Sequence, residues 1–189
     1  RKVFSFLSSL ADVYIYASER TKNYYRPYIR SRKPEFVIPA PVDTDMFDPA
    51  DHYDGDEALL DSWRGKTVIG TICNVNPLKG LETLILAASV LNRHLDNLVF
   101  VVIGPVFSSQ QYYFEQLQSL CDELSVDNFE FVGARSDVRP LLERFNVFVC
   151  SSRAESSPIS VWEAMSMGKA IISTNVGDVP LFVQDNHNN

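Results

Sequence analysis

The sequence contains few of the residues that most often build metal centres and disulfide frameworks. Its 189 residues include only three cysteines and three histidines. Cys73, Cys121 and Cys150 are scattered and form no Cys-x-x-Cys pair, so we expect reduced thiols, as in a cytoplasmic protein. The histidines are also far apart, which argues against a structural metal site or a histidine-based triad within this chain.

A long apolar run and an excess of positive charge are also missing. The chain is 46% hydrophobic and 22% charged, as globular proteins are, and no stretch is long and apolar enough to span a membrane. The formal net charge of −7 argues against general nucleic-acid binding. Residues 20–33 differ, with six basic residues and no acid. We interpret them as solvated surface; the alternative is peripheral contact with anionic lipid heads at the inner face of a membrane.

Apolar runs alternate with helical patterns through residues 67–173. This pattern predicts an α/β fold, a Rossmann-like, doubly wound parallel sheet between two helical layers. Ser136 is expected to cap a short helix that ends near Leu142, and Gly70 indicates a close backbone approach. The expected strands are residues 67–73, 98–103, 129–132, 147–150 and 170–173.

The first 66 residues follow a different pattern. Two short strands at residues 12–17 and 36–39 flank a helix capped by Ser18, and a segment rich in proline and aspartate follows. Because the chain begins at Arg1 without an initiator methionine, we expect a piece of a longer protein. We divide it into an initial piece, a linker with a lead-in helix and a main domain, at residues 1–42, 43–66 and 67–189.

Two carboxylates flank the start of the helix that follows residues 147–150. Pro158 suits the first turn of that helix, which places Glu155 in the preceding loop and Glu163 roughly 8 Å inside the helix, at ~1.5 Å per residue. In open α/β sheets ligands bind at such loops, where free N–H groups favour anions. Spacing alone favours a plainer interpretation, in which Glu155 is a helix-terminal acid and Glu163 a solvated surface residue.

A second loop of this kind spans residues 74–79. Pro77 and Gly80 shape its turn, and Lys79 lies near the start of the next helix. A lone lysine there is most often a surface residue. Beside a phosphate it is the natural cation for a leaving diphosphate.

The segment E-S-S-P-I-S-V-W-E-A-M-S-M-G-K-A-I-I-S-T-N-V-G-D-V-P begins at Glu155. It resembles the E-x7-E region of retaining GT-B glycosyltransferases (glycosyl transferases group 1, family 4-like). The similarity includes Glu-Ala-Met after the second acid, Gly-Lys before the strand and the Ser-Thr-x-x-Gly turn. I-P-x-x-V-D-T-D-x-F at residues 38–47 resembles the interdomain linker of these enzymes. The usual glycine after the first acid is Ser156 here, and the usual Asn-Gly before Val-Asp is Ala40-Pro41.

This resemblance implies transfer of a sugar, with retention, from a nucleotide-diphosphate-sugar to a glycan or lipid-linked acceptor, as in polysaccharide biosynthesis. Residues 1–42 would be the tail of an acceptor domain, and residues 67–189 a donor-binding domain truncated at its C-terminus. No metal and no cofactor beyond the donor substrate are implied. Alone, the chain should bind donor nucleotide and transfer little.

The resemblance also implies roles for individual residues. Lys79 would neutralise the departing diphosphate, Glu155 would engage the donor sugar, and Glu163 would bind the ribose hydroxyls. An arginine that the family commonly has five residues before the lysine is Asn74 here, and Arg153 is a candidate to compensate. The implied catalytic residues are Glu155 and Lys79. The implied donor-binding residues are Asn74, Lys79, Gly133, Arg135, Glu155, Ser156, Ser157, Pro158, Ile159 and Glu163.

Two other functions remain open at this point. One is a sugar-nucleotide epimerase or a phosphorylase on the same fold, which product analysis would distinguish from a transferase. The other is a non-catalytic α/β interaction module, since a fold alone does not fix a function. The joint occurrence of Glu155, Glu163 and Lys79 at expected ligand-facing positions argues against the module.

Overall fold

The computed structural model describes residue 6 and residues 8–29 and 33–184. The chain forms two compact units. The larger unit comprises Val42–Arg153 and Ser160–Thr174, and the smaller unit comprises Arg1–Pro41, Ala154–Ile159 and Asn175–Asn189. The units reflect which residues pack together rather than which segments form one domain. The three-part division at residues 42 and 66 therefore stays a prediction.

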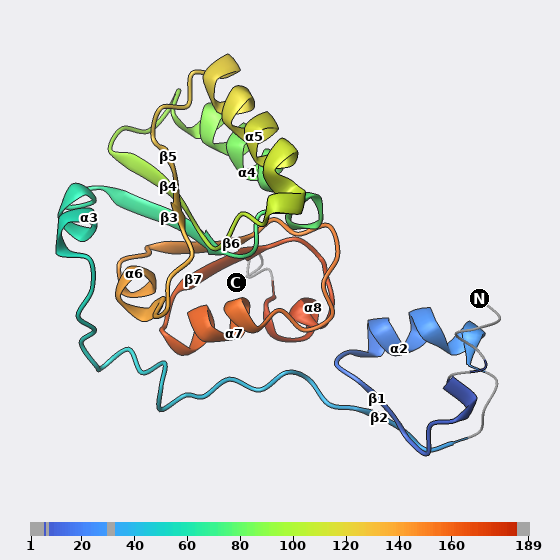
Figure 1. Ribbon diagram of the computed structural model, residues 1–189. Helices are drawn as coiled ribbons and strands as arrows, with labels where there is room; N and C mark the ends of the chain where they lie inside the picture. Colours follow the sequence, from blue (N-terminus) through green and yellow to red (C-terminus); the bar gives the residue numbers. More distant parts are fainter. Residues whose placement is uncertain (1–5, 7, 30–32, 185–189) are drawn as a thin grey trace. The chain divides into compact units, whose positions relative to one another are not determined.

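A five-stranded parallel sheet forms the centre of the larger unit (Figure 1). Its strands are β3 (Thr67–Ile72), β4 (Leu98–Ile103), β5 (Phe129–Gly133), β6 (Val147–Cys150) and β7 (Ala170–Ser173). They lie in the order β5-β4-β3-β6-β7, and every residue of β4 is buried. A strand covered on both faces needs such a continuous apolar run. The predicted α/β fold with a parallel sheet is confirmed.

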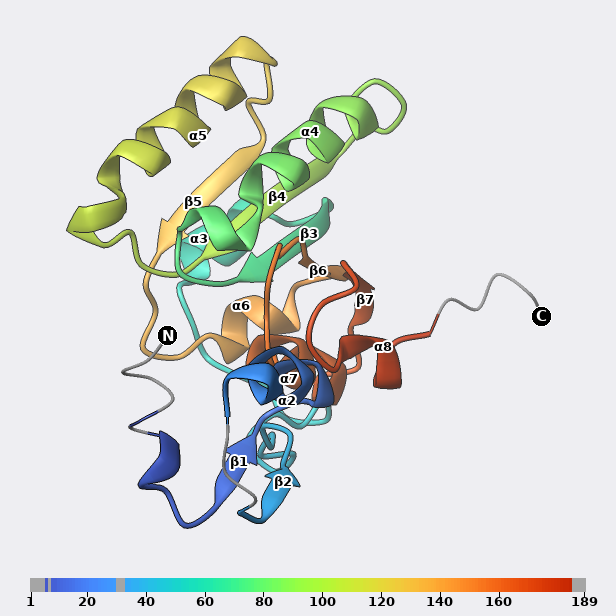
Figure 2. The same cartoon turned by 90° about the vertical axis from the view of Figure 1, so that its right-hand side faces the viewer.

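Helices cover both faces of this sheet. They are α3 (Glu57–Ser62), α4 (Leu81–Leu91), α5 (Gln111–Glu123), α6 (Arg139–Glu143) and α7 (Ile159–Ser166), with short 3-10 turns η2 (Pro77–Lys79) and η3 (Ser108–Gln110). Figures 1 and 2 show α4 and α5 on one face and α6 and α7 on the other. On the first face Leu81 and Ile85 of α4 pack with Tyr113 and Leu117 of α5 against Val102 of β4. The arrangement is consistent with the three layers expected from the sequence.

Two local expectations need correction. Ser136 does not cap a helix: α6 begins at Arg139, with Val138 at the N-cap position and no side-chain cap. Pro140 occupies the first turn, where its missing N–H costs nothing, and the carboxylate of Asp137 accepts a hydrogen bond from the Arg139 N–H at 3.0 Å. The close approach at Gly70 involves a side chain rather than backbone, because a Cβ there would collide with the ring of Phe145.

The smaller unit contains a two-stranded parallel sheet and short helices. Its elements are β1 (Tyr14–Tyr16), α2 (Glu19–Tyr25), the 3-10 turn η1 (Arg26–Tyr28), β2 (Glu35–Val37) and α8 (Val179–Phe182). Ser18 caps α2 as predicted, since its hydroxyl accepts a hydrogen bond from the Thr21 N–H at 3.1 Å. Tyr14 and Tyr16 are buried whereas Ile15 is exposed, so the aromatic face of β1 is the packed one.

Candidate functional site

The loops that follow β3 and β6 are joined at the carboxyl ends of these two paired strands. The Arg153 N–H donates to the carbonyl oxygen of Leu78 at 2.7 Å, and the Ser151 hydroxyl donates to the carbonyl oxygen of Lys79 at 2.8 Å. Gly80 lies so close that a Cβ would collide with the Ser151 carbonyl oxygen. These contacts fix the turn that carries Lys79 against the start of the β6–α7 loop.

The turn itself is shaped by its own residues. Asn76 precedes η2 and accepts a hydrogen bond from the Leu78 N–H at 3.0 Å through its side-chain oxygen. Gly80 then adopts φ +60°, which allows α4 to start immediately after η2. Lys79 therefore lies directly before Gly80, and the eleven-residue helix α4 starts directly after that glycine. A helix start and a lysine together favour a negatively charged ligand.

A cavity of about 160 Å³ lies at the carboxyl ends of β3 and β4. Its lining includes Asn74 and Arg135, so the structure brings together two of the predicted binding residues that are 61 positions apart in sequence. Gly133 closes β5 beside this cavity, and its carbonyl oxygen accepts a hydrogen bond from the Gly104 N–H at 2.9 Å. Whole-ligand pockets usually measure about 300–1,000 Å³, so this cavity suits one part of a ligand. The lining residues are Ile72, Cys73, Asn74, Ile103, Gly104, Pro105, Ala134, Arg135 and Val138.

Glu163 lies in the second turn of α7 and is partly buried. Burial raises the pKa of its carboxyl above the ordinary value, because an ionised group loses hydration there. Within the described part of the chain, no side chain or backbone group bonds to this carboxylate. A partly buried carboxylate retains acceptor capacity for hydroxyl groups of a ligand. Glu163 is therefore less solvated than the plainer interpretation expects, and its binding role stays a prediction.

Glu155 and its neighbours belong to the smaller unit. The Ser156 hydroxyl lies 2.6 Å from that of Thr21, and the Ser157 hydroxyl accepts a hydrogen bond from the Ala40 N–H at 3.1 Å. Pro158 is buried and Ile159 is half exposed. Both serine side chains thus help to hold the smaller unit together. The predicted cooperation of this segment with Lys79 and Glu163, which lie in the larger unit, stays a prediction.

Sequence reasoning missed the residues that position the site. Ser151 holds the Lys79 carbonyl, and the Thr174 hydroxyl donates to the Ser152 carbonyl oxygen at 2.6 Å. The Glu82 carboxylate, in the first turn of α4, bonds to Arg153 at 3.1 Å and to the hydroxyl of Tyr113 at 3.0 Å. The available signal was a run of small polar residues after a buried strand. It shows where a loop begins but not which partner it reaches.

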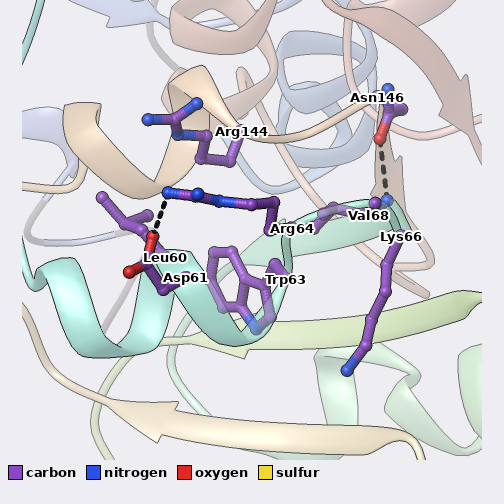
Figure 3. A pocket seen from close by; sticks show the side chains of 9 residues that line it. Leu60, Asp61, Trp63, Arg64, Lys66, Val68, Arg144 and Asn146 are labelled. Atoms are coloured by element: carbon purple, nitrogen blue, oxygen red, sulfur yellow. Dashed lines mark hydrogen bonds and ion pairs between the residues drawn. The ribbon is translucent and has the colours of Figure 1, made fainter.

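Another cationic pocket lies at the amino ends of β3 and β6 (Figure 3). It measures about 250 Å³ and is lined by Arg64, Lys66 and Arg144, among others. Arg64 pairs with Asp61 at 2.7 Å, and Lys66 points away from both arginines (Figure 3). Ligands of open α/β sheets bind at the carboxyl ends of the strands, so this pocket is not the candidate site.

The described residues contain neither a candidate membrane span nor a candidate metal cluster. No helix among them combines the length and the apolar character needed to cross a membrane. No group of three or more histidine, cysteine, aspartate or glutamate side chains in the same residues is arranged to hold a metal ion.

These features define a doubly wound α/β domain with a cationic turn at the carboxyl ends of its strands, the edge at which open α/β sheets bind ligands. The chain belongs to the family described as Glycosyl transferases group 1, which matches residues 61–189. It is 33% identical over 156 residues to a phosphatidylinositol N-acetylglucosaminyltransferase subunit of Arabidopsis thaliana, covering 79% of this chain and 31% of that protein.

Two further similarities concern a bacterial enzyme and a solved structure. The UDP-Gal:alpha-D-GlcNAc-diphosphoundecaprenol alpha-1,3-galactosyltransferase of Escherichia coli is 28% identical over 145 residues, with 74% of this chain and 36% of that protein covered. The crystal structure of Anabaena HepE in complex with UDP and glucose superposes with a TM-score of 0.81 at 19% identity, covering 97% of this chain and 50% of that one. The likeness to HepE shows a shared fold, that of GT-B glycosyltransferases, as the sequence predicted. The chain spans about a third of the length of these two curated relatives.

Proposed function

We propose that this chain is the donor-binding part of a retaining GT-B glycosyltransferase. The whole enzyme moves a sugar from a nucleotide-diphosphate-sugar to a glycan or lipid-linked acceptor. Family membership over residues 61–189 supports this proposal. The observation that carries it is the joined pair of loops at the carboxyl ends of β3 and β6, which holds Lys79 at the start of α4.

The diphosphate is the part of the donor that this edge suits best. In the transfer, the bond between the anomeric carbon and the diphosphate oxygen breaks, the acceptor hydroxyl oxygen bonds to that carbon on the same face, and the hydroxyl proton passes to the departing diphosphate. Negative charge then develops on the departing diphosphate. Lys79 and the N–H groups at the start of α4 stabilise that charge.

The nucleoside is assigned to the other polar groups of the larger unit. Glu163 accepts hydrogen bonds from the ribose hydroxyls, a role that its unpaired, partly buried carboxylate supports. Gly133 and Arg135 border the base beside the cavity of about 160 Å³, which Asn74 also lines. We propose a uridine base, because the E. coli relative is named for a UDP-sugar and HepE was crystallised with UDP.

The donor sugar is assigned to the segment that begins at Glu155. Glu155 engages the sugar hydroxyls, and the backbone of residues 156–159 lies along the sugar and phosphates. Because the Ser156 and Ser157 hydroxyls bond within the smaller unit, we assign donor contacts here to backbone groups. With Lys79 and a helix start facing the diphosphate, the proposal requires no metal.

Nucleotide binding to the chain tests this proposal. A nucleotide at a hundred times its Kd stabilises a fold by about 2.7 kcal/mol. At about 2–4 °C per kcal/mol for this size, we expect UDP to raise the Tm by about 5–10 °C and GDP and ADP by less. Lys79→Ala and Glu163→Ala should each reduce the shift, and the matched control Lys66→Ala, at the amino ends of the strands, should not.

Three results would contradict the assignment. If UDP raised the Tm of Lys79→Ala as much as that of the natural chain, Lys79 would not be a cation of the diphosphate site. Loss of the shift on addition of a metal chelator would refute the metal-free proposal. Isomerisation of a UDP-sugar by the full-length protein without any acceptor would identify an epimerase instead.

A further inference from the structure

We propose that Arg153 is a second cation for the donor diphosphate and is held ready for it by Glu82. This inference rests on the proposed function, since it concerns the same nucleotide diphosphate. It assigns a binding role to a side chain on the loop after β6, next to the turn that carries Lys79.

A backbone hydrogen bond holds the two residues next to each other. Arg153 donates its N–H to Leu78, the residue before Lys79, at 2.7 Å. The Cγ of Arg153 lies 3.6 Å from the position that a Cβ on Gly80 would occupy. Arg153 is therefore bonded to the residue before Lys79 and lies close to the residue after it, so the two side chains start from neighbouring points of one turn.

Glu82 orients the guanidinium group. Its carboxylate uses one oxygen for Arg153, at 3.1 Å, and the other for the hydroxyl of Tyr113, at 3.0 Å. The Arg153 side chain is 59% exposed, so it can leave this pair without breaking packed contacts. Exposed ion pairs contribute little to stability, whereas a guanidinium group binds phosphate through paired, charge-assisted hydrogen bonds.

Tyr113 makes the exchange feasible. Burial, and then the neighbouring Glu82, raises the pKa of the tyrosine hydroxyl, so it stays protonated and remains a donor. When Arg153 turns to a phosphate, the Glu82 carboxylate still accepts the hydrogen bond from Tyr113, and the Glu82 side chain stays partly exposed to water. No partly buried carboxylate is left without a partner, which is the condition for an inexpensive exchange.

Four other cations in the described part of the larger unit lie at other places. Arg135 donates to the backbone carbonyls of Val132 and Ala134 and lies at the β5 side of the edge. Arg64, Lys66 and Arg144 lie at the amino ends of the strands. Arg153 differs from these four in that its backbone is bonded to the turn that carries Lys79.

A comparison of UDP with UMP isolates the second phosphate. Calorimetric titration of the Arg153→Ala chain should show UDP binding weakened about tenfold and UMP binding changed by less than about twofold. The exposed control Arg144→Ala should leave both affinities unchanged. Equal weakening of UDP and UMP by Arg153→Ala, or no weakening of either, would overturn the inference.

Glu82→Gln tests the waiting position separately. It keeps a partner for Tyr113 but removes the negative charge that holds Arg153. We expect UDP binding to be unchanged or tighter by up to about threefold, because Arg153 no longer leaves an anion. A loss as large as that of Arg153→Ala would contradict the exchange. If the natural chain binds no UDP, the proposed function fails. If it binds UDP and the Arg153→Ala chain binds it equally well, this inference alone fails.

Discussion

The two ends of strands β3 and β6 carry similar side chains but hold them in different ways. At the carboxyl ends, Lys79 and Arg153 lie on loops that are bonded to each other through backbone groups. At the amino ends, Arg64 and Arg144 line a pocket of larger volume, and the Arg64 side chain is 82% exposed. Positive charge and a hollow surface occur at both ends, so neither identifies a site. The two ends differ in that the loops carrying Lys79 and Arg153 are hydrogen-bonded to each other.

At the amino ends of the strands, polar groups add hydrogen bonds to those of the sheet. Asn146 accepts a hydrogen bond from the Val68 N–H at 2.8 Å through its side chain, and its own N–H donates to the Val68 carbonyl at 2.9 Å. Trp63 is almost fully buried and donates to Glu130 at 2.8 Å. These contacts stabilise the start of the strands, and the arginines around them remain in water.

The largest expected contrast concerns two glycines, one at each end. Gly80 and Gly65 both have positive φ, +60° and +76°, but of the two only Gly80 has a neighbour within 4 Å of where a Cβ would lie. Gly65→Ala should lower the free energy of unfolding by about 1–2 kcal/mol through backbone strain alone. Gly80→Ala adds a collision with the Ser151 carbonyl, so we expect a loss of about 3–5 kcal/mol.

Denaturant unfolding of the two variants measures this difference. Both should be compared with the natural chain in the same titration, and the slope with denaturant should be unchanged. Equal losses for Gly80→Ala and Gly65→Ala would mean that the two loops at the carboxyl ends are not held together as described.

A smaller contrast concerns two serines. The buried Ser151 hydroxyl bonds to the Lys79 carbonyl, whereas the exposed Ser62 hydroxyl bonds to the Leu59 carbonyl in α3 at 2.6 Å. Ser151→Ala should cost about 1–2 kcal/mol, because the Lys79 carbonyl loses its partner in a partly buried setting. Ser62→Ala should change stability by less than about 0.5 kcal/mol, since water replaces the hydroxyl. Thermal unfolding of both variants checks the pair, and a larger loss for Ser62→Ala would reverse the comparison.

The smallest expected effect concerns Glu163 and depends on pH. Its folded-state pKa is raised by burial, so the folded chain binds the proton more tightly than the unfolded chain does. The charged carboxylate therefore costs stability at neutral pH, and that cost disappears as pH falls through the raised pKa toward the ordinary value of about 4.3. Glu163→Gln should stabilise the chain by less than about 1 kcal/mol at pH 7, with no gain near pH 4.

The same variant should weaken UDP binding, because an amide accepts fewer hydrogen bonds from ribose hydroxyls than a carboxylate does. Stability and affinity would then move in opposite directions, as at many functional sites. Unfolding curves for the variant and the natural chain at both pH values give the difference directly. A gain that persisted at pH 4 would show that the carboxyl charge is not its origin.

The sequence was most informative where one physical rule dominates. Short apolar runs are typical of parallel strands, so residues 98–103, 147–150 and 170–173 were predicted with the bounds that the structure has, although only the first of these strands is buried throughout. The start of α6 was placed too early, at Ser136, because a serine before a helix can cap it or lie in the preceding loop. In the structure Pro140 lies in the first turn of α6, and the Asp137 carboxylate bonds to the first N–H of the helix. Residue spacing alone does not predict either arrangement.

The candidate site shows the same division. The positions of Lys79 in the turn after one strand and of Glu163 inside the helix after another followed from periodicity, and the structure places both there. The bond between Arg153 and Glu82 joins residues 71 positions apart, one on the loop after β6 and the other in the first turn of α4. Side-chain partners of this kind depend on the strand order, in which β3 pairs with β6. Periodicity predicts each strand but not its neighbour.

The three cysteines differ in their access to reagents. Cys150 is buried at the end of β6, and burial raises the pKa of Cys121 to about 11, so that thiol stays protonated near neutral pH. Cys73 is partly exposed and lines the cavity of about 160 Å³ beside Asn74. The thiol of Cys73 is thus a chemical reporter within the cavity proposed to hold the base. The rate at which it is alkylated should fall when the base is bound, so that occupancy can be followed without an added label.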